Sequence, residues 1–340
     1  MNRRLLANAH AWLSLALAAP LLALVTTGGI LLFKNDLFAP SLMTEITPDV
    51  GLATLLLTSR MREASVILVG DEERPLHTVE WRNGEIEYFD ASTGAVHEAG
   101  PRLQLEHSLY LLHTELLVGG FGDLLIRVFA PLFVLIALIG LILWWPGRAQ
   151  WRWQALFPGA SRPRLLGTHL AIGALIVIPA IMQMSAGGLL AHNPTIRYWL
   201  KPLATIAPLT EVELRRFGPG DSADAIAAVR EAYPQVRISQ VSPLRSSADN
   251  SAWIFKLRLP GESHPNGRSL LEVDVASGKF GKLSDARRDD IAAAYDDTLY
   301  PLHVGSLTGW LRYLWVLTAI GLCLLIVSGV WSFLKRPRRP

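Results

Sequence analysis

The sequence is poor in cysteine and in charged residues. Cys323 is the one cysteine among 340 residues, which excludes an intramolecular disulfide, a thiolate zinc site, an iron–sulfur cluster and covalent attachment of c-type haem. Charged residues make up 18% of the chain and hydrophobic residues 51%, which is more apolar surface than a soluble protein of this size buries. The sequence also lacks a phosphate loop and a G-x-G-x-x-G motif after a strand, so no nucleotide or flavin site of those types is expected.

Four stretches of the chain contain no Asp, Glu, Lys or Arg over a length that can cross a bilayer, which takes about 20 residues. They cover residues 11–33, 128–145, 165–196 and 313–334. The sequence therefore predicts an α-helical integral membrane protein with four transmembrane helices. A cleavable signal peptide is the alternative for the first stretch, but its apolar run is long for a signal and no small-x-small cleavage site ends it.

The basic residues next to these stretches indicate how the chain crosses the membrane. Ten of the 32 Lys and Arg residues lie in segments without any acidic residue: Arg3, Arg4, Arg148, Arg152, Arg162, Arg164, Lys335, Arg336, Arg338 and Arg339. These segments are the two termini and the connection between the second and third stretches. Cytoplasmic segments are rich in Lys and Arg, so we expect these parts in the cytoplasm and the two long segments in the periplasm. The protein would then be a multi-pass protein of a bacterial inner membrane.

The predicted order of segments follows directly from the spans. The ranges are a first transmembrane helix over 1–34, a first periplasmic α+β domain over 35–110, a second transmembrane helix over 111–146, a cytoplasmic loop over 147–164, a third transmembrane helix over 165–192, a second periplasmic domain over 193–300, a fourth transmembrane helix over 301–335 and a cytoplasmic tail over 336–340.

The spans also match one another in pairs. His10 precedes Pro20, Gly28 and Gly29 by 10, 18 and 19 residues, and the same spacing separates His169 from Pro179, Gly187 and Gly188. The corresponding residues of the second and fourth spans are Leu112, His113, Gly122, Arg127 and Trp144 in one, and Leu302, His303, Gly309, Arg312 and Trp331 in the other. We therefore predict a four-helix transmembrane bundle made of two parallel repeats, each with an inserted extracytoplasmic α+β domain.

A weaker repeat occurs in the two long segments. Residues 87–94 and 271–278 each alternate apolar and polar side chains and end in the pattern D-x-x-[ST]-G, which predicts a strand followed by a turn. The second segment also contains a helical pattern over 222–233, with Asp221 or Ser222 as its N-cap. Each long segment is therefore expected to fold as a small α+β domain.

Four of the nine histidines stand at the repeated positions, namely His10, His169, His113 and His303. The first two begin spans on the cytoplasmic side, and the other two lie at or beyond the outer interface if their helices continue unbroken. Two histidines that face each other across a two-fold axis can supply both axial ligands of one haem iron. The sequence therefore predicts two b-type haems, one held by each pair. The alternative is that each histidine is only an amphipathic residue at the membrane interface.

Several neighbouring residues suit this prediction. Arg127 and Arg312 recur at the outer ends of their spans, where a guanidinium can pair with a haem propionate. The glycine pairs of the first and third spans would let a helix or a porphyrin approach the backbone closely. His192 has no counterpart in the first half and is expected to be structural or to face a substrate. The histidines among polar residues, which we expect to be exposed to solvent, are His77, His97 and His264.

These patterns together resemble the PepSY-associated transmembrane proteins of bacteria over nearly the whole chain. The residues that carry the resemblance are His10, Thr26-Thr27-Gly28-Gly29, Leu112-His113, the segment 221–233, Asp274-x-x-Ser277-Gly278, Pro301-Leu302-His303-x-Gly305 and Ser328-Gly329-Val330-Trp331. Members of that family include inner-membrane reductases that bind haem and reduce ferric siderophores in the periplasm. The resemblance therefore implies that iron is the substrate.

We expect a di-haem electron-transfer protein that takes electrons from a quinol or a cytoplasmic reductant. It would reduce a ferric siderophore or another ferric chelate on the periplasmic side, as a haem-dependent ferric-chelate reductase. The acidic balance of the outer segments suits a cationic or neutral chelate, and no nucleic acid is expected as a partner. Two alternatives stay open: a non-enzymatic PepSY membrane protein that binds a peptide, a protease or a receptor, and a transporter built from parallel repeats.

Overall fold

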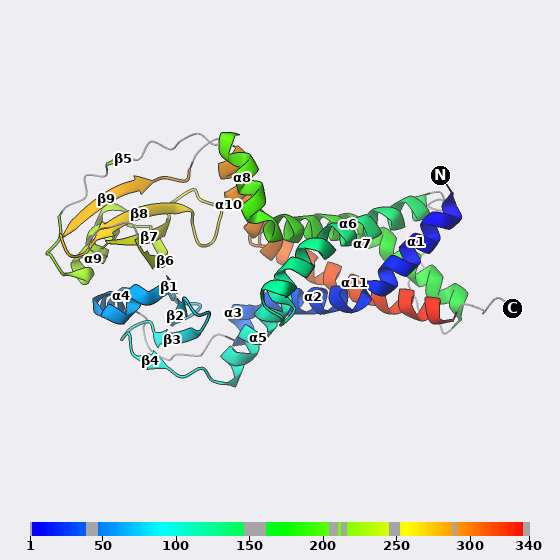
Figure 1. Cartoon of the computed structure of the whole chain (residues 1–340), viewed down its shortest axis with the longest axis horizontal. Helices are drawn as coiled ribbons and strands as arrows, with labels where there is room; N and C mark the ends of the chain where they lie inside the picture. The colour runs from blue at the N-terminus through cyan, green and yellow to red at the C-terminus, as the bar shows by residue number, and fades with distance from the viewer. Residues whose placement is uncertain are drawn as a thin grey trace. The chain divides into compact units, whose positions relative to one another are not determined.

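A computed structural model describes residues 2–38, 47–145, 161–203, 210–211, 216–244, 252–287 and 291–335. The chain forms two compact units, whose elements are labelled in Figure 1. The helical unit comprises Met1–Phe33, Leu105–Ile196 and Leu302–Pro340, and the sheet unit comprises Lys34–Gln104 and Arg197–Pro301. Most of the predicted cytoplasmic loop over 147–164, and the whole tail over 336–340, lie outside the described residues.

The helical unit contains the segments that can cross a membrane. The helices that contribute to it are α1 (Arg3–Ala16), α2 (Ala18–Leu31), α5 (Pro101–Glu115), α6 (Gly120–Trp144), α7 (Arg162–Ala191), α10 (Ile291–Val304) and α11 (Leu311–Leu334). By length and composition α6, α7 and α11 can each span a membrane alone, and α1 and α2 can do so together as a pair bent by 63°. The chain is thus a multi-pass membrane protein with three continuous candidate spans and a fourth that is bent.

The bend between α1 and α2 has its cause in Pro20. Proline has no N–H to donate to the carbonyl four residues earlier, and its ring crowds that carbonyl, so the helix breaks in the preceding turn. The break falls at Leu17. Pro179 has the same spacing from its histidine, yet it lies inside α7, which continues through it over 30 residues. A proline therefore marks where a helix can break, and the packing around it decides whether it does.

Separate helices precede the second and fourth spans. The sequence predicts that each of these spans is one helix that includes its histidine, but the chain turns in both. Leu116 and Leu117 have φ angles of 50° and 62°, and Gly305 has a φ of 73°, which a continuing α-helix does not allow. His113 therefore lies on α5 and His303 on α10, and neither lies on a spanning helix.

A nine-stranded antiparallel sheet forms the centre of the sheet unit in the described residues. Its strands are β1 (Ala64–Leu68), β2 (Leu76–Trp81), β3 (Ile86–Asp90), β4 (Val96–His97), β5 (Thr210–Glu211), β6 (Arg237–Pro243), β7 (Ala252–Arg258), β8 (Ser269–Asp274) and β9 (Lys279–Ser284). They lie in the order β4-β3-β2-β1-β6-β7-β8-β9-β5. The remaining elements are α3 (Lys34–Phe38), α4 (Pro48–Leu57), η1 (Ser59–Glu63), α8 (Asn193–Leu200), η4 (Lys201–Leu203) and α9 (Ser222–Ala232). Residues of α4 and α9 share one hydrophobic core with the strands.

The two long segments build this sheet together. The sequence predicts two separate domains over 35–110 and 193–300, whereas β1 of the first segment pairs with β6 of the second, with Ile67 opposite Val241. An unpaired edge strand invites association with other chains, and this pairing removes one edge from each segment. A single sheet unit therefore replaces the two expected domains.

Polar contacts between α4 and α9 also join the two segments. The Ser222 hydroxyl donates to the carbonyl oxygen of Ala53 at 2.8 Å, and both oxygens of the Asp49 carboxylate accept from the Arg230 guanidinium, at 2.9 and 3.0 Å. Asp221 caps α9, as the sequence predicts, because its carboxylate accepts a backbone N–H of the first turn at 2.8 Å.

The repeated D-x-x-[ST]-G pattern forms the turns after β3 and β8, as predicted. The Asp90 carboxylate accepts from the backbone N–H groups two and three residues later at 3.0 and 2.9 Å, and Asp274 does the same at 3.1 and 3.3 Å. Gly94 and Gly278 end these turns with φ angles of 74° and 69°, which glycine adopts without strain.

Two histidines that the sequence predicts to be exposed are buried in the sheet unit. His77 in β2 is 0% exposed, and His264 in the loop before β8 is 3% exposed. Nδ1 of His77 accepts the N–H of Gly70 at 3.0 Å, and Nδ1 of His264 accepts that of Asn266 at 3.1 Å. Burial lowers the pKa of His77 to about 4 and that of His264 to about 3. Both rings therefore serve as neutral hydrogen-bond acceptors inside the fold.

Candidate functional site

The histidines at the repeated positions meet two by two in the helical unit. The ring centres of His10 on α1 and His169 on α7 are 6.2 Å apart, and the ring planes make an angle of 75°. The ring centres of His113 on α5 and His303 on α10 are 6.1 Å apart, with an angle of 33°. The structure thus brings together the two pairs that were named from the spacing of the sequence.

Each of the four imidazoles packs against a glycine of a neighbouring helix. The contacts are His10 with Gly140 of α6, His169 with Gly329 of α11, His113 with Gly28 of α2 and His303 with Gly187 of α7. A Cβ atom at these glycines would lie 3.2, 3.2, 2.8 and 2.9 Å from the Cε1 atom of the ring, in the same order. These separations are shorter than an ordinary carbon–carbon contact, so glycine leaves the space that each ring fills.

Helix α7 takes part in both pairs. It carries His169 near its start and, 18 residues further on, Gly187, against which His303 packs. Because an α-helix rises 1.5 Å per residue, these two positions are roughly 27 Å apart along the helix. The two pairs therefore lie near opposite ends of the same span.

A backbone carbonyl fixes the proton on three of the four rings. Nδ1 lies 3.2 Å from the carbonyl oxygen of Ile136 in His10, 3.1 Å from that of Leu325 in His169 and 3.0 Å from that of Leu24 in His113. Each carbonyl belongs to the residue four positions before the glycine under that ring. Because a carbonyl only accepts, Nδ1 carries the proton, and the lone pair of Nε2 is left for a metal.

One histidine of each pair also has a hydroxyl neighbour. Thr27 Oγ1 lies 3.2 Å from Nδ1 of His113, and Ser328 Oγ lies 3.4 Å from Nδ1 of His169. Both hydroxyls donate their own proton to a carbonyl one turn earlier, at 2.7 Å, so they present an accepting oxygen to the ring. These two rings therefore share the Nδ1 proton between a carbonyl and a hydroxyl.

His303 departs from this pattern. Among the described residues, its buried Nδ1 forms no hydrogen bond with the geometry of the other three, although the backbone carbonyl of Gln183 interacts with the ring, and Oε1 of Gln183 has no partner. Gln183 stands four positions before Gly187, and its Nε2 donates to the carbonyl oxygen of His303 at 2.9 Å. Trp315 Nε1 donates to the preceding carbonyl, that of Leu302, at 2.7 Å. Two side chains thus hold the backbone at His303, and the ring is held by packing and by a weaker approach to the Gln183 carbonyl.

The number of protein ligands distinguishes a haem from a bare metal ion. A zinc site takes three or four protein ligands, and within the described ranges no three His, Cys, Asp or Glu side chains come together. Each pair offers two imidazoles, which suits a haem iron because the porphyrin supplies its other ligands. The ring centres within each pair are 6.2 and 6.1 Å apart, so His10 with His169 and His113 with His303 could hold a haem, which would supply one-electron chemistry. The residues of both pairs therefore fit a haem.

The residues predicted to assist have protein contacts of their own. Arg127 forms an ion pair with Asp123 one turn earlier on α6, with 2.5 Å between Nη2 and Oδ2. The guanidinium of Arg312 lies 4.7 Å from the ring centre of Phe33. A role of either arginine toward haem propionates stays a prediction. Nδ1 of His192 lies 2.8 Å from a carbonyl oxygen one turn earlier, at the end of α7, which is a structural contact.

The glycine under His10 is missing from the sequence prediction. The spacing of the second and fourth spans aligns Trp144 with Trp331. In the structure Gly140 and Gly329 hold equivalent positions, because each lies under a histidine. Aligning the two spans on these glycines differs by two residues from aligning them on the tryptophans. A search for a glycine at the same offset from the apolar end of each span would have found it, because the glycine and not the tryptophan contacts the ring.

Family models show where the chain belongs. The model described as the PepSY-associated TM region matches residues 7–336, which include all four histidines and the glycines beneath them. The chain belongs to this family. The PepSY-associated TM region accounts for the several apolar helices and confirms the resemblance seen in the sequence. A search of curated proteins finds no match.

Proposed function

We propose that this member of the PepSY-associated TM region family is a di-haem electron-transfer protein of a bacterial inner membrane. It would accept electrons from a quinol or a cytoplasmic reductant and reduce a ferric siderophore or another ferric chelate in the periplasm, for iron uptake. The observation that supports this most is the approach of the four imidazoles in two pairs, with ring centres 6.2 and 6.1 Å apart. The positive-inside rule would put the His10–His169 pair near the cytoplasm and the His113–His303 pair near the periplasm.

The residues of the chain would set the position and the basicity of the ligands. Haem, when bound, supplies one-electron chemistry because its iron alternates between the ferric and ferrous states. A carbonyl that accepts the Nδ1 proton makes Nε2 a better ligand and restrains the ring. The glycines hold each ring against a helix, so the packing of the helices sets the separation within a pair. This chemistry requires no general acid, base or nucleophile from the protein.

We also propose that the chain consists of two parallel repeats, each giving one histidine to each pair. The contacts support this, because Gly28 and Gly187 hold equal positions in the first and third spans and each faces a histidine of the helix that precedes the next span. The strand order supports it as well, since strands β1 to β4 and β6 to β9 form two runs that meet at β1 and β6.

Visible spectroscopy of the full chain, purified in detergent from haem-replete cells, tests the haem proposal. We expect the bands of low-spin haem b and about two haems per chain. The variants His10→Ala, His169→Ala, His113→Ala and His303→Ala should each lose about one haem. His107→Ala, on the same helix as His113 but six residues earlier, should keep both. A colourless protein, or histidine variants that retain both haems, would contradict the proposal and favour a PepSY protein that only binds a partner.

Reduction of the substrate needs its own measurement. Dithionite-reduced protein, freed of excess reductant and mixed anaerobically with a ferric hydroxamate chelate, should reoxidise in proportion to the chelate added, while ferrous iron appears in a ferrozine assay. A haem that stays reduced under these conditions would contradict ferric-chelate reduction and indicate that the protein passes electrons to another acceptor.

A further inference from the structure

Three cationic side chains lie together on the sheet face opposite to α4 and α9. Lys256 and Arg258 stand two residues apart on β7 and point to one face, while Leu257 between them points into the core. Ser269 pairs with Leu257 across β7 and β8, so Arg268 lies beside Arg258 on the neighbouring strand.

Each of these three cations donates to a neutral oxygen. Lys256 Nζ donates to Oε1 of Gln240 at 3.3 Å, Arg258 Nε to the carbonyl oxygen of Glu262 at 3.4 Å and Arg268 Nε to the carbonyl oxygen of Asp296 at 3.0 Å. All three side chains are half-buried. In the part of the chain that the structure describes, none of them forms an ion pair with a carboxylate.

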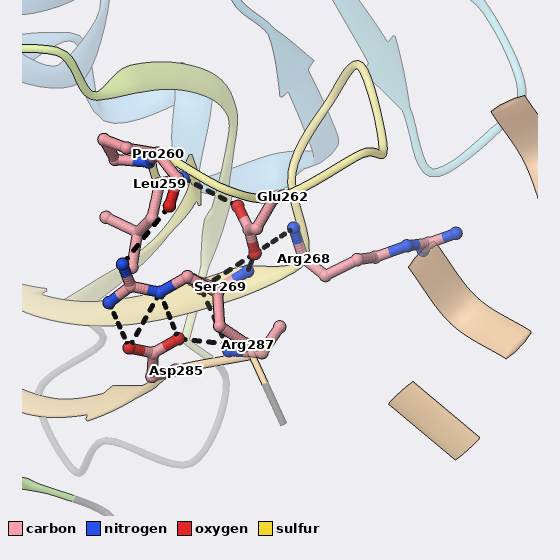
Figure 2. A network of polar contacts seen from close by, with 8 residues as sticks. Leu259, Pro260, Glu262, Arg268, Ser269, Asp285 and Arg287 are labelled. Carbon is pink, nitrogen blue, oxygen red and sulfur yellow. Dashed lines mark hydrogen bonds and ion pairs between the residues drawn. The ribbon is translucent and has the colours of Figure 1, made fainter. Parts of the chain in front are cut away.

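The carboxylates around the cations are occupied by other donors. Glu262 accepts four hydrogen bonds within its loop, from the N–H groups of Leu259, Arg268 and Ser269 at 2.7, 3.1 and 3.0 Å and from the Ser269 hydroxyl at 2.9 Å. Figure 2 shows the side chain of Arg268 leading away from this network. Asp297 accepts two backbone N–H groups at 2.9 and 2.8 Å, and Asp296 pairs with Arg197 at 2.7 Å.

Half-buried charges of the same sign raise the free energy of this part of the sheet, because water screens them only in part. Burial, followed by the positive charges of Arg268 and Arg197, lowers the pKa of Lys256 to about 8, and the negative charges of Glu262 and Asp296 offset this shift only in part. An anion between the three cations would offset both the repulsion and the loss of hydration.

We propose that Lys256, Arg258 and Arg268 bind the oxyanion group of a soluble ligand, a carboxylate or a phosphate. A guanidinium matches such a group with two parallel hydrogen bonds, and a lysine adds a compact positive charge. The site lies within the sheet unit, and it is independent of whether the helical unit carries haem.

Inorganic phosphate is the probe, titrated calorimetrically into the full-length protein in detergent at pH 7 and constant ionic strength. Phosphate should bind saturably to the wild type and about tenfold or more weakly to Lys256→Met and Arg268→Met, because each variant loses a charged partner. Lys282→Met removes an exposed lysine of β9 and should bind like the wild type. No saturable binding, or equal affinity in all four proteins, would overturn the proposal.

A lipid headgroup carries the same phosphate chemistry, and nanodiscs separate the two sources. Phosphate binding that is equal in phosphatidylcholine and phosphatidylglycerol discs supports a soluble ligand. Binding that disappears in phosphatidylglycerol discs would overturn the soluble ligand and assign the three cations to the membrane surface.

Thermal unfolding keeps the proposal testable if a substitution changes the fold. Without phosphate, Lys256→Met should unfold at a higher temperature than the wild type, because it removes a charge that Arg268 and Arg197 repel. Phosphate should raise the unfolding temperature of the wild type and leave that of Lys256→Met and Arg268→Met unchanged. A Lys256→Met variant that unfolds earlier, beside a wild type that does not respond to phosphate, would make the cations structural and overturn the site.

Discussion

Each glycine beneath an imidazole has a hydrogen where any other residue has a carbon, and this difference sets how far a ring can approach a helix. The repeated positions of Gly28 and Gly187 indicate a close approach from the sequence alone. They do not indicate what approaches, because the histidines that lie on them come from other helices. Contacts between residues far apart in the chain leave no local pattern to read.

Gly28→Ala should displace the His113 ring and remove about one haem per chain, because the new Cβ would lie 2.8 Å from Cε1 of that ring. Gly29→Ala is the matched control, since its Cβ would meet Ala319 at an ordinary 3.5 Å. Haem per chain and the reduced absorption bands are the measurements. A Gly28→Ala protein that binds two haems with unchanged bands would show that the position of the His113 ring does not depend on its contact with Gly28.

The buried His77 should make the sheet unit sensitive to acid. Its pKa is about 4 in the fold and about 6.5 in the unfolded chain. Above pH 6.5 neither state binds the proton, so the histidine does not change the stability. As the pH falls from about 6.5 to about 4 only the unfolded state takes up the proton, and the free energy of unfolding falls by up to about 3 kcal/mol.

Denaturant titrations at pH 7, 5.5 and 4.5 measure this loss. His77→Asn retains an oxygen that can accept the N–H of Gly70 but has no proton to bind, so the loss should be smaller than in the wild type. His97→Asn, at a half-buried position of β4, is the control and should follow the wild type. Equal pH dependence in all three proteins would mean that other groups cause the acid sensitivity.

At the scale of helices and strands, composition is a strong guide to the spans because a helix that crosses a bilayer must be long and apolar. Composition does not locate the breaks within them. The helix that carries His113 ends at Leu116 and Leu117, two leucines in a left-handed conformation that leucine rarely adopts. The packing of the finished bundle sets the conformation of these leucines. The sequence marks only the end of the turn, with Gly119 and Gly120, and Gly119 has a φ of 60°.

The bend at Pro20 should matter for the His10–His169 pair. Pro20→Ala restores a backbone donor and favours a straighter α1–α2 pair, which would move His10 relative to His169 and weaken haem binding there. Pro179→Ala changes the same residue type in α7, which is already continuous, and should keep haem binding. Haem content at increasing detergent concentration compares the two. Equal retention in both variants would show that packing, and not the proline, holds the bend.

At the scale of the whole molecule, the sequence indicates the parts better than their assembly. The repeated turn pattern predicts a strand in each long segment, and both strands are present as β3 and β8. The pairing of β1 with β6 was not predicted, because strands far apart in the chain pair through long-range contacts that a local pattern does not encode. For the same reason the sequence predicts two domains where the structure has one sheet unit.

The joined sheet should unfold as one cooperative unit. Arg230→Ala removes the two hydrogen bonds to Asp49 and one to the carbonyl of Val236, and should cost about 1–3 kcal/mol of unfolding free energy. Hydrogen exchange followed by mass spectrometry should then show faster exchange in both segments. Arg287→Ala, which breaks an exposed pair with Asp285 and a 3.3 Å hydrogen bond to the carbonyl oxygen of Pro260, both within the second segment, is the control and should change little. Faster exchange confined to the second segment would mean that the halves unfold separately.

Helix α7 also limits which mutations the protein can accept during evolution. His169 and Gly187 are separated by a fixed number of residues on one unbroken helix, and one extra residue between them would rotate one end by about 100° and shift it by about 1.5 Å. Substitutions that keep this stretch apolar leave the geometry intact. A single insertion or deletion would instead turn either the His169 ring away from His10 or Gly187 away from His303. The identity of most residues in the stretch is therefore free to drift, but their number is not.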